Sequence, residues 1–313
     1  MKRKHVLFSL LALSSIALSG CYVDLGFIKL GKAPEEETAS EEGGNKPAPI
    51  DGKVIKDSDA YYDAAADAER ISTYYSGFND SRSGSALLTA IRSLNSLKRT
   101  KEVGYELMGT SSSGYFKFTD FSVKSTIDYV DGIPFGTKVS SFYSGKSAYT
   151  FNREHVWPES HGGESVEDDI FMTRPTIEEE NSDRGNSAYV TGMVTEHSGW
   201  DPVAAFAQSL GVYQSVRGEC ARIIFYCMTA TSTLSLVDSN SLSSSSMGKL
   251  TDLVVWSCEN PVTYREKRRN VGGQYLQGNR NTFVDHPEYV CKIWGDTNST
   301  TKSACSKAGF ATN

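Results

Sequence analysis

The chain has 313 residues and a formal net charge of −6 at pH 7, a length that fits one large domain or two small ones. Hydrophobic residues make up 39% of it, and the 9 prolines and 27 glycines exclude a collagen-like or wholly low-complexity protein. The charged fraction of 22% excludes a disordered polyelectrolyte as the main component. The acidic balance by itself argues against a nucleic-acid partner, because such proteins usually carry a basic face.

The N-terminal segment has the order of an export signal. Three basic residues at positions 2–4 precede an apolar stretch at 6–18, which is too short to span a bilayer as a stable helix. The Leu-Ser-Gly-Cys run that ends at Cys21 resembles the lipobox of bacterial lipoproteins, in which the cysteine becomes the lipidated first residue. We therefore expect residues 1–20 to be a lipoprotein signal peptide and the lipid on Cys21 to anchor the chain to the membrane at the cell surface. The alternative is an ordinary signal peptide followed by a chance cysteine.

The composition changes after this signal. Residues 21–58 are acidic and rich in proline, glutamate and glycine, which indicates a solvated tether with little to bury. We expect a single folded domain over residues 59–313.

Within that domain, helical and strand patterns alternate. Apolar residues at helical spacing predict helices over 61–75, with Asp59 as a possible N-cap, and over 84–97. Aromatic and β-branched residues that alternate with polar ones predict short strands between 115 and 149. Further helices are predicted over 200–213, 218–228, 247–256 and from 261 to about 274, the last with Pro261 at its first position. A serine-rich loop is expected over 234–246. Together these elements indicate an α+β domain.

Five cysteines follow Cys21, all in the last third of the chain: Cys220, Cys227, Cys258, Cys291 and Cys305. An exported chain permits disulfides, and an odd number leaves at least one thiol over or an intermolecular bond. The spacing of Cys220 and Cys227 on a predicted helix suits two buried thiols. No Cys-x-x-Cys pair occurs, which argues against a thiolate zinc site.

The densest group of polar and aromatic residues spans positions 152–162. His155 lies there between Glu154 and a Val-Trp-Pro run. Imidazole is the side chain best suited to accept a proton from water near neutral pH. If the segment is a strand, Glu154 points to the opposite side from His155, so one could serve a metal and the other the water. By residue types alone, a histidine that is hydrogen-bonded for structure is the more common case.

Four blocks of the sequence stand out along the chain. The first is Asn-Arg-Glu-His-Val-Trp-Pro at 152–158. It is followed by Arg-Pro-Thr at 174–176 with Asn-Ser-Asp-Arg-Gly-Asn at 181–186, by the helix-like block at 217–226 and by the block at 277–289. In this order they resemble the bacterial endonuclease I family of secreted nucleases, and the first block looks like the family's active-site motif. Collinear blocks are much stronger evidence than one motif.

The resemblance implies a ββα-metal (His-Me finger) core surrounded by helices. It implies that His155 is the general base for the attacking water and that Glu154 is a ligand of a divalent cation, most often Mg²⁺, with Mn²⁺ or Ca²⁺ as alternatives. Arg184 would clamp the phosphate, unless it is structural. The implied substrate is DNA, and RNA as a second possibility, cleaved with little sequence preference to leave 5′-phosphates.

The sequence departs from the family at position 172. The family has a histidine or asparagine where this chain has Met172, a soft thioether that does not suit Mg²⁺. Asp168 and Asp169 would share a helix face with position 172 and could replace the ligand, or they could simply stabilise a helix N-terminus. Asn181 and Asn186 are the other candidates. The alternative function is a catalytically inactive, nucleic-acid-binding surface lipoprotein.

Basic residues gather toward the C-terminus, where residues 211–313 hold 11 basic and 8 acidic side chains. This part of the chain, with Arg153 and Arg174, offers a path for a polyanion despite the overall charge. We expect Arg153, Arg174, Arg222 and Arg280 to line it; for each one, an internal ion pair is the alternative. We expect a monomer.

Overall fold

The computed structural model describes residues 23–24, 29–30, 61–111, 114–195, 199–206, 215–239 and 245–312. The predicted signal peptide, Cys21, Asp59 and nearly all of the predicted tether lie outside the described residues. Among the described residues, no helix is both long and apolar enough to cross a membrane.

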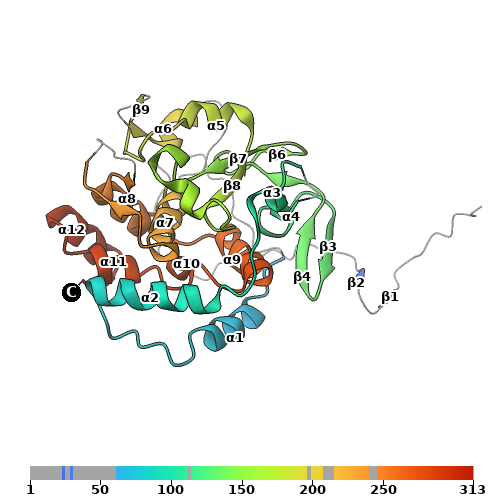
Figure 1. Cartoon of the computed structure of the whole chain (residues 1–313), viewed down its shortest axis with the longest axis horizontal. Coiled ribbons are helices and arrows are strands. Elements are labelled where there is room, and N and C mark those ends of the chain that lie inside the picture. The colour runs from blue at the N-terminus through green and yellow to red at the C-terminus, as the bar shows by residue number, and fades with distance from the viewer. Residues whose placement is uncertain are drawn as a thin grey trace, which may run out of the picture.

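Helices and short strands alternate along the domain (Figure 1). The helices are α1 (Ala64–Tyr74), α2 (Gly84–Lys98), α3 (Tyr105–Met108), α4 (Phe116–Thr119), α5 (Glu178–Arg184), α6 (Pro202–Phe206), α7 (Ser215–Ala230), α8 (Leu250–Glu259), α9 (Tyr264–Gln277), α10 (Thr282–Asp285), α11 (Tyr289–Trp294) and α12 (Ser299–Lys307), with 3-10 turns η1 (Glu159–His161) and η2 (Gly163–Val166). The strands are β1 (Val23–Asp24), β2 (Lys29–Leu30), β3 (Ile127–Val130), β4 (Ile133–Gly136), β5 (Val139–Ser140), β6 (Ser147–Ala148), β7 (Asn152–His155), β8 (Thr173–Thr176), β9 (Val194–Thr195), β10 (Gly199–Trp200), β11 (Ser235–Leu236) and β12 (Ser246–Met247).

The sheets are small and mostly antiparallel. Among the described residues, one sheet has the order β1-β2-β3-β4, and four others have two strands each. Strands β3 and β4 are joined by Asp131 and Gly132, both with positive φ, the backbone conformation that a tight two-residue hairpin requires. The predicted α+β class is confirmed.

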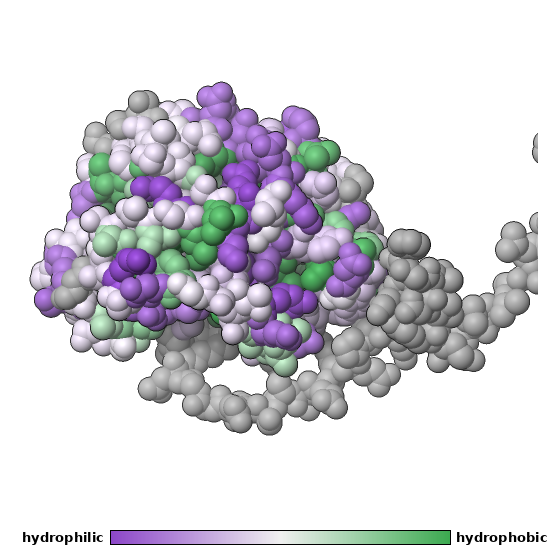
Figure 2. Space-filling model, turned by 60° about the horizontal axis from the view of Figure 1, so that its bottom comes forward, coloured by the Kyte–Doolittle hydropathy of each residue, from purple (hydrophilic) through white to green (hydrophobic). Residues whose placement is uncertain are grey.

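Helix α7 forms the centre of the core. Every side chain described from Gly218 to Thr229 is buried, because α2, α8 and α10 pack around the helix. The apolar positions Leu87 and Ile91 on α2 lie four residues apart and are completely buried. On the face shown in Figure 2, hydrophobic side chains are scattered among hydrophilic ones, as on an ordinary solvated surface.

Several predicted helix ends were wrong. Helix α1 begins at Ala64, where Asp63 caps the backbone N–H of Ala66. Helix α9 begins at Tyr264 rather than with Pro261 at its first position, because Thr263 and Glu266 form a capping box. Met247 lies in β12, which pairs with β11 inside the predicted serine-rich loop. For the helix predicted over 200–213, the structure has α6, and residues 207–214 lie outside the described part.

Candidate active site

The candidate site is built around the motif at residues 152–158. Strand β7 pairs there with β8, and helix α5 follows β8 in the chain. The strands pair antiparallel, with Glu154 opposite Arg174 and His155 opposite Thr173. Helix α5 then turns back and packs against β7. Alternation along β7 buries Glu154, which is 2% exposed, and leaves the His155 side chain 15% exposed. The expectation that these two side chains point to opposite sides of a strand is confirmed.

Glu154 is buried among polar side chains. Its Oε1 accepts a hydrogen bond of 2.6 Å from the Tyr143 hydroxyl and lies 3.2 Å from Nη1 of Arg184. Burial raises the pKa of Glu154 to about 7, although the Arg184 cation and the Tyr143 hydrogen bond act in the opposite direction. The carboxylate of Glu180 adds to the rise. Among the described residues, no hydrogen bond to the other oxygen, Oε2, occurs.

Arg184 joins α5 to the end of β7. Its two terminal nitrogens donate 2.8 Å hydrogen bonds to the carbonyl oxygens of His155 and Val156. Its guanidinium also lies over the Tyr189 ring, 4.9 Å from the centroid. Because Arg184 is 1% exposed, it holds Glu154 and the His155 backbone in place, which supports the structural alternative over direct contact with a phosphate.

His155 has a carboxylate partner that the sequence did not suggest. Its Nε2 lies 3.3 Å from Oε2 of Glu167, a half-exposed residue that follows η2. The His155 ring also lies 5.1 Å from the Tyr105 ring, centroid to centroid. Among the described residues, Nδ1 of His155 makes no hydrogen bond, so one ring nitrogen is held and the other is free to take a proton.

Arg153 projects beside this histidine. Its guanidinium stacks 3.8 Å from the centroid of the Tyr105 ring and pairs with Glu106 at 2.9 Å. The Arg153 side chain is 16% exposed and Glu106 is 84% exposed. The pair with exposed Glu106 is weak, but Arg153 also donates a 3.1 Å hydrogen bond to the Tyr105 carbonyl, so an anionic ligand would have to compete with both partners.

The segment with the two aspartates was predicted wrongly. Residues 167–172 form turns and not a helix, so Asp168, Asp169 and Met172 do not share a helix face. Asp169 is fully buried and accepts hydrogen bonds from Tyr226 and Gln277 and from the Phe171 N–H. Asp168 is exposed and accepts a hydrogen bond from the Tyr105 N–H. Both line an open cleft of about 490 Å³ that also contains Arg99, Lys101 and Asn279.

This geometry removes the aspartates from a shared site with Glu154. Among the described residues, Glu154, Asp168 and Asp169 do not form a group with ligand atoms within 4.8 Å of one another. Met172 is completely buried in the hydrophobic core. Its thioether side chain has no oxygen, so position 172 supplies no side-chain oxygen to a metal. Asn181, by contrast, is half-buried on α5 and lies three residues before Arg184, so it is on the same side of the helix as that arginine.

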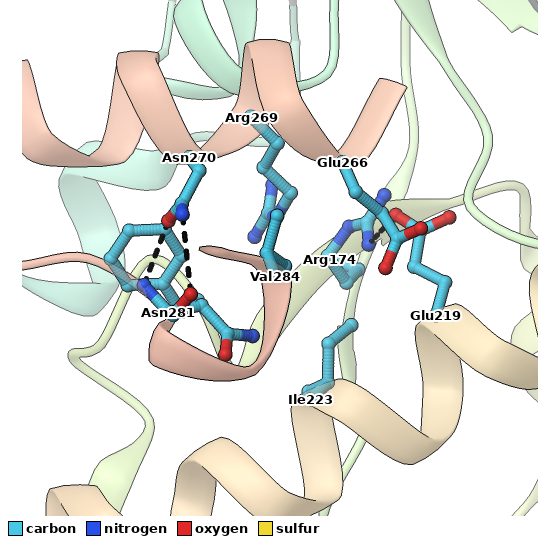
Figure 3. Close-up of a pocket in the computed structure, with 9 residues that line it drawn as sticks. Arg174, Glu219, Ile223, Glu266, Arg269, Asn270, Asn281 and Val284 are labelled. Atoms are coloured by element: carbon cyan, nitrogen blue, oxygen red, sulfur yellow. Dashed lines mark hydrogen bonds and ion pairs between the residues drawn. The ribbon is translucent and has the colours of Figure 1, made fainter. Parts of the chain in front are cut away.

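Three of the predicted nucleic-acid contacts are internal ion pairs. Arg174 is 1% exposed and binds Asp120 and Glu219, and Figure 3 shows it beside Glu219 at the edge of a small cavity. The other two are completely buried: Arg222 binds Glu266, and Arg280 binds Asp67 and Asp285. A buried arginine with its donors occupied is unavailable to a phosphate, so the ion-pair alternative is correct for these three.

The strand pair, the following helix and the histidine with its carboxylates fit the nuclease class that the four sequence blocks resemble. Comparison with known families gives the same answer: residues 117–288 match the family Endonuclease I, and the chain belongs to this family. Two curated relatives are extracellular ribonucleases. The one from Bacillus amyloliquefaciens is 33% identical over 172 residues, and the one from Bacillus subtilis (strain 168) is 33% identical over 163 residues.

Each alignment covers 48% of this chain and 56% of the relative, so the chain spans a little over half the length of the curated relatives it matches. The family match contains β7, β8 and α5 and ends at Glu288, before α11 and α12.

Proposed function

We propose that this protein is a metal-dependent endonuclease that hydrolyses phosphodiester bonds of DNA or RNA outside the cell, with little sequence preference. The observation that supports it most is the arrangement at the end of β7. There, His155 has one nitrogen held by Glu167 and the other free, and Glu154 is fixed below it by Arg184. The names of the relatives favour RNA as a substrate, and the family description favours an endonuclease.

In this proposal His155 accepts a proton from the attacking water at Nδ1. The hydrogen bond from Nε2 to Glu167 fixes the ring orientation, and the carboxylate stabilises the imidazolium that forms. Contact with the Tyr105 ring would further limit rotation of the imidazole ring. General-base catalysis of this kind contributes about 10²- to 10⁴-fold to the rate.

The side chains around the end of β7 suit a hard divalent cation such as Mg²⁺. Glu154 has an oxygen, Oε2, without a hydrogen bond in the described part of the chain, and Asn181 offers an amide oxygen on the adjacent face of α5. Carboxylate and amide oxygens are the ligands such ions take. The bound cation would neutralise charge on the scissile phosphate and on the leaving 3′ oxygen, so that a 5′-phosphate remains. Of the replacements considered for position 172, Asn181 is therefore the one we propose.

The protein would contact mainly the sugar-phosphate backbone of the nucleic acid. Such contacts contain no sequence information, which agrees with the proposed lack of sequence preference. Arg153 beside His155, and Arg99 and Lys101 in the neighbouring cleft, are the cations we propose for them. Affinity would fall as salt rises.

We further propose that the protein is a monomer anchored at the cell surface through a lipid on Cys21. The support for the lipid anchor is the order of the first 21 residues alone. Replacement of Cys21 by serine should move the protein from the detergent phase to the aqueous phase in detergent partitioning. A Cys21→Ser chain that still enters the detergent phase would contradict this.

The alternative is a nucleic-acid-binding protein without catalytic activity. The burial of Met172 favours it, because no ligand oxygen remains at that position.

Incubation of the purified full chain with supercoiled plasmid and with RNA, in Mg²⁺, Mn²⁺ or Ca²⁺ and with a chelator, distinguishes the two. The proposal predicts nicking that the chelator abolishes and products that a 5′-phosphate-specific exonuclease degrades. A salt-sensitive shift of DNA mobility without cleavage in any ion would establish the alternative.

A further inference from the structure

Three cysteines from three helices meet near the end of the chain, one of them within the family match and two beyond it. Cys291 on α11 and Cys305 on α12 form a disulfide and are completely buried. Cys258 on α8 is half-buried and is a free thiol. Its Sγ lies 3.5 Å from Sγ of Cys291 and 3.9 Å from Sγ of Cys305. Of the three free cysteines in the described part of the chain, Cys258 thus lies against the disulfide.

Simple exchange between the thiol and the disulfide is disfavoured. Burial raises the pKa of the Cys258 thiol to about 11, and the neighbouring Glu259 carboxylate adds to the rise. The reactive thiolate is therefore scarce at neutral pH. The thiol is also nearly equidistant from the two bonded sulfurs, whereas attack on one of them requires approach along the line of the bond. Exchange therefore does not explain why the three sulfur atoms lie so close together.

The distances from Cys258 fit a metal-thiolate site. Zn²⁺ binds thiolates at about 2.3 Å in tetrahedral geometry, which places neighbouring sulfurs about 3.8 Å apart. The two separations of Cys258 from its partners are already close to this value. Among the described residues, this trio is also the one group of His, Cys, Asp or Glu side chains with at least three ligand atoms within 4.8 Å of one another.

We propose that reduction of the Cys291–Cys305 bond converts the trio into a binding site for a thiophilic divalent cation such as Zn²⁺. A dithiol reductant supplies two electrons and two protons and becomes a disulfide itself, which leaves three thiols. The cation displaces their protons, takes three thiolates and keeps a fourth position for water or an external ligand. The metal would then join α8, α11 and α12, where the disulfide joined only α11 and α12.

The test uses the full chain, reduced and kept without oxygen, and then given Zn²⁺ or Co²⁺ and freed of unbound ion by gel filtration. Cys258→Ala removes one sulfur and leaves the disulfide pair intact. Cys227→Ala removes a buried thiol on α7 that is not part of the trio, and serves as the matched control. Metal content by mass spectrometry, the sulfur-to-cobalt charge-transfer band and the thermal unfolding midpoint are measured for each chain.

The proposal predicts about one Zn²⁺ per reduced chain in the wild type and in Cys227→Ala, with a raised unfolding midpoint and a near-ultraviolet cobalt band. The oxidised wild type and reduced Cys258→Ala should retain less than about a tenth of this metal. Retention of metal by the oxidised chain, equal retention by Cys258→Ala, or no retention by the reduced wild type would each overturn the proposal. These readouts are independent of nuclease activity.

Discussion

A buried cluster of charges behind β8 gives a prediction with a definite size. Glu219 on α7 accepts a 2.5 Å hydrogen bond from Arg174 of β8 and is paired with Arg265 of α9. Burial by itself raises the pKa of Glu219, but Arg174 and Arg265 outweigh it and lower the pKa from 4.5 to about 2. A lowered folded-state pKa stabilises the protein when pH exceeds 4.5, and this stabilisation is lost as pH falls toward 2.

The size of the effect follows from the shift. A pKa difference of about 2.5 at 1.36 kcal/mol per unit corresponds to about 3 kcal/mol at pH 7. Glu219→Gln should therefore lower the free energy of unfolding by about 3–5 kcal/mol at pH 7, since it also leaves buried arginines without a partner. The deficit should shrink by about 2 kcal/mol at pH 3, where the wild-type carboxylate has lost most of its advantage.

Urea denaturation of the full chain at pH 7 and pH 3, followed by circular dichroism, measures both values. Glu179→Gln is the matched control, because Glu179 is exposed on α5 and its replacement should change stability by less than about 0.5 kcal/mol. A Glu219→Gln deficit below about 1 kcal/mol at pH 7, or one that is the same at both pH values, would refute the electrostatic reasoning.

Three further predictions concern the site. Glu167→Gln should lower kcat about 10- to 100-fold with little change in KM, because the ring of His155 loses its charged partner; an unchanged kcat in steady-state assays would contradict this. Asn181→Ala should raise the Mg²⁺ concentration needed for half-maximal activity by at least about tenfold, whereas Asn186→Ala should not; equal Mg²⁺ curves would remove Asn181 from the site. Met172→Ala should cost about 2–5 kcal/mol of stability by leaving a cavity, with the Mg²⁺ requirement unchanged; a shifted requirement would show that position 172 belongs to the metal site.

Local patterns predicted much of the fold. The apolar spacing on α2 and the buried run on α7 identified these helices, because each has to bury a continuous face. The start of α9 was misplaced because Thr263 and Glu266 cap it, a stronger determinant than Pro261. The segment 167–172 was predicted as a helix because the resemblance aligns it with a helix of the family, whereas in this chain it forms turns that lead into β8.

The candidate site was predicted only in part, because sequence patterns report on neighbours along the chain. His155 and Glu154 stand in one conspicuous motif, and strand alternation predicted their opposite orientations. Glu167 was missed because it approaches His155 only through the turn around Gly162, which has a positive φ of 91°. The cysteine trio was missed because its members come from three helices, and spacing along the chain contains no sign of that meeting.

The central claim is that His155 activates water for metal-dependent cleavage of nucleic acid. The most direct test compares initial rates of Mg²⁺-dependent cleavage by the full chain and by its His155→Ala variant at equal concentration. His286→Gln is the control, because that histidine stacks on Tyr289 in another part of the domain. The account predicts a fall of about 10²- to 10⁴-fold for His155→Ala alone, with both variants folded by circular dichroism. Equal rates for the wild type and His155→Ala, or no cleavage by the wild type, would contradict it.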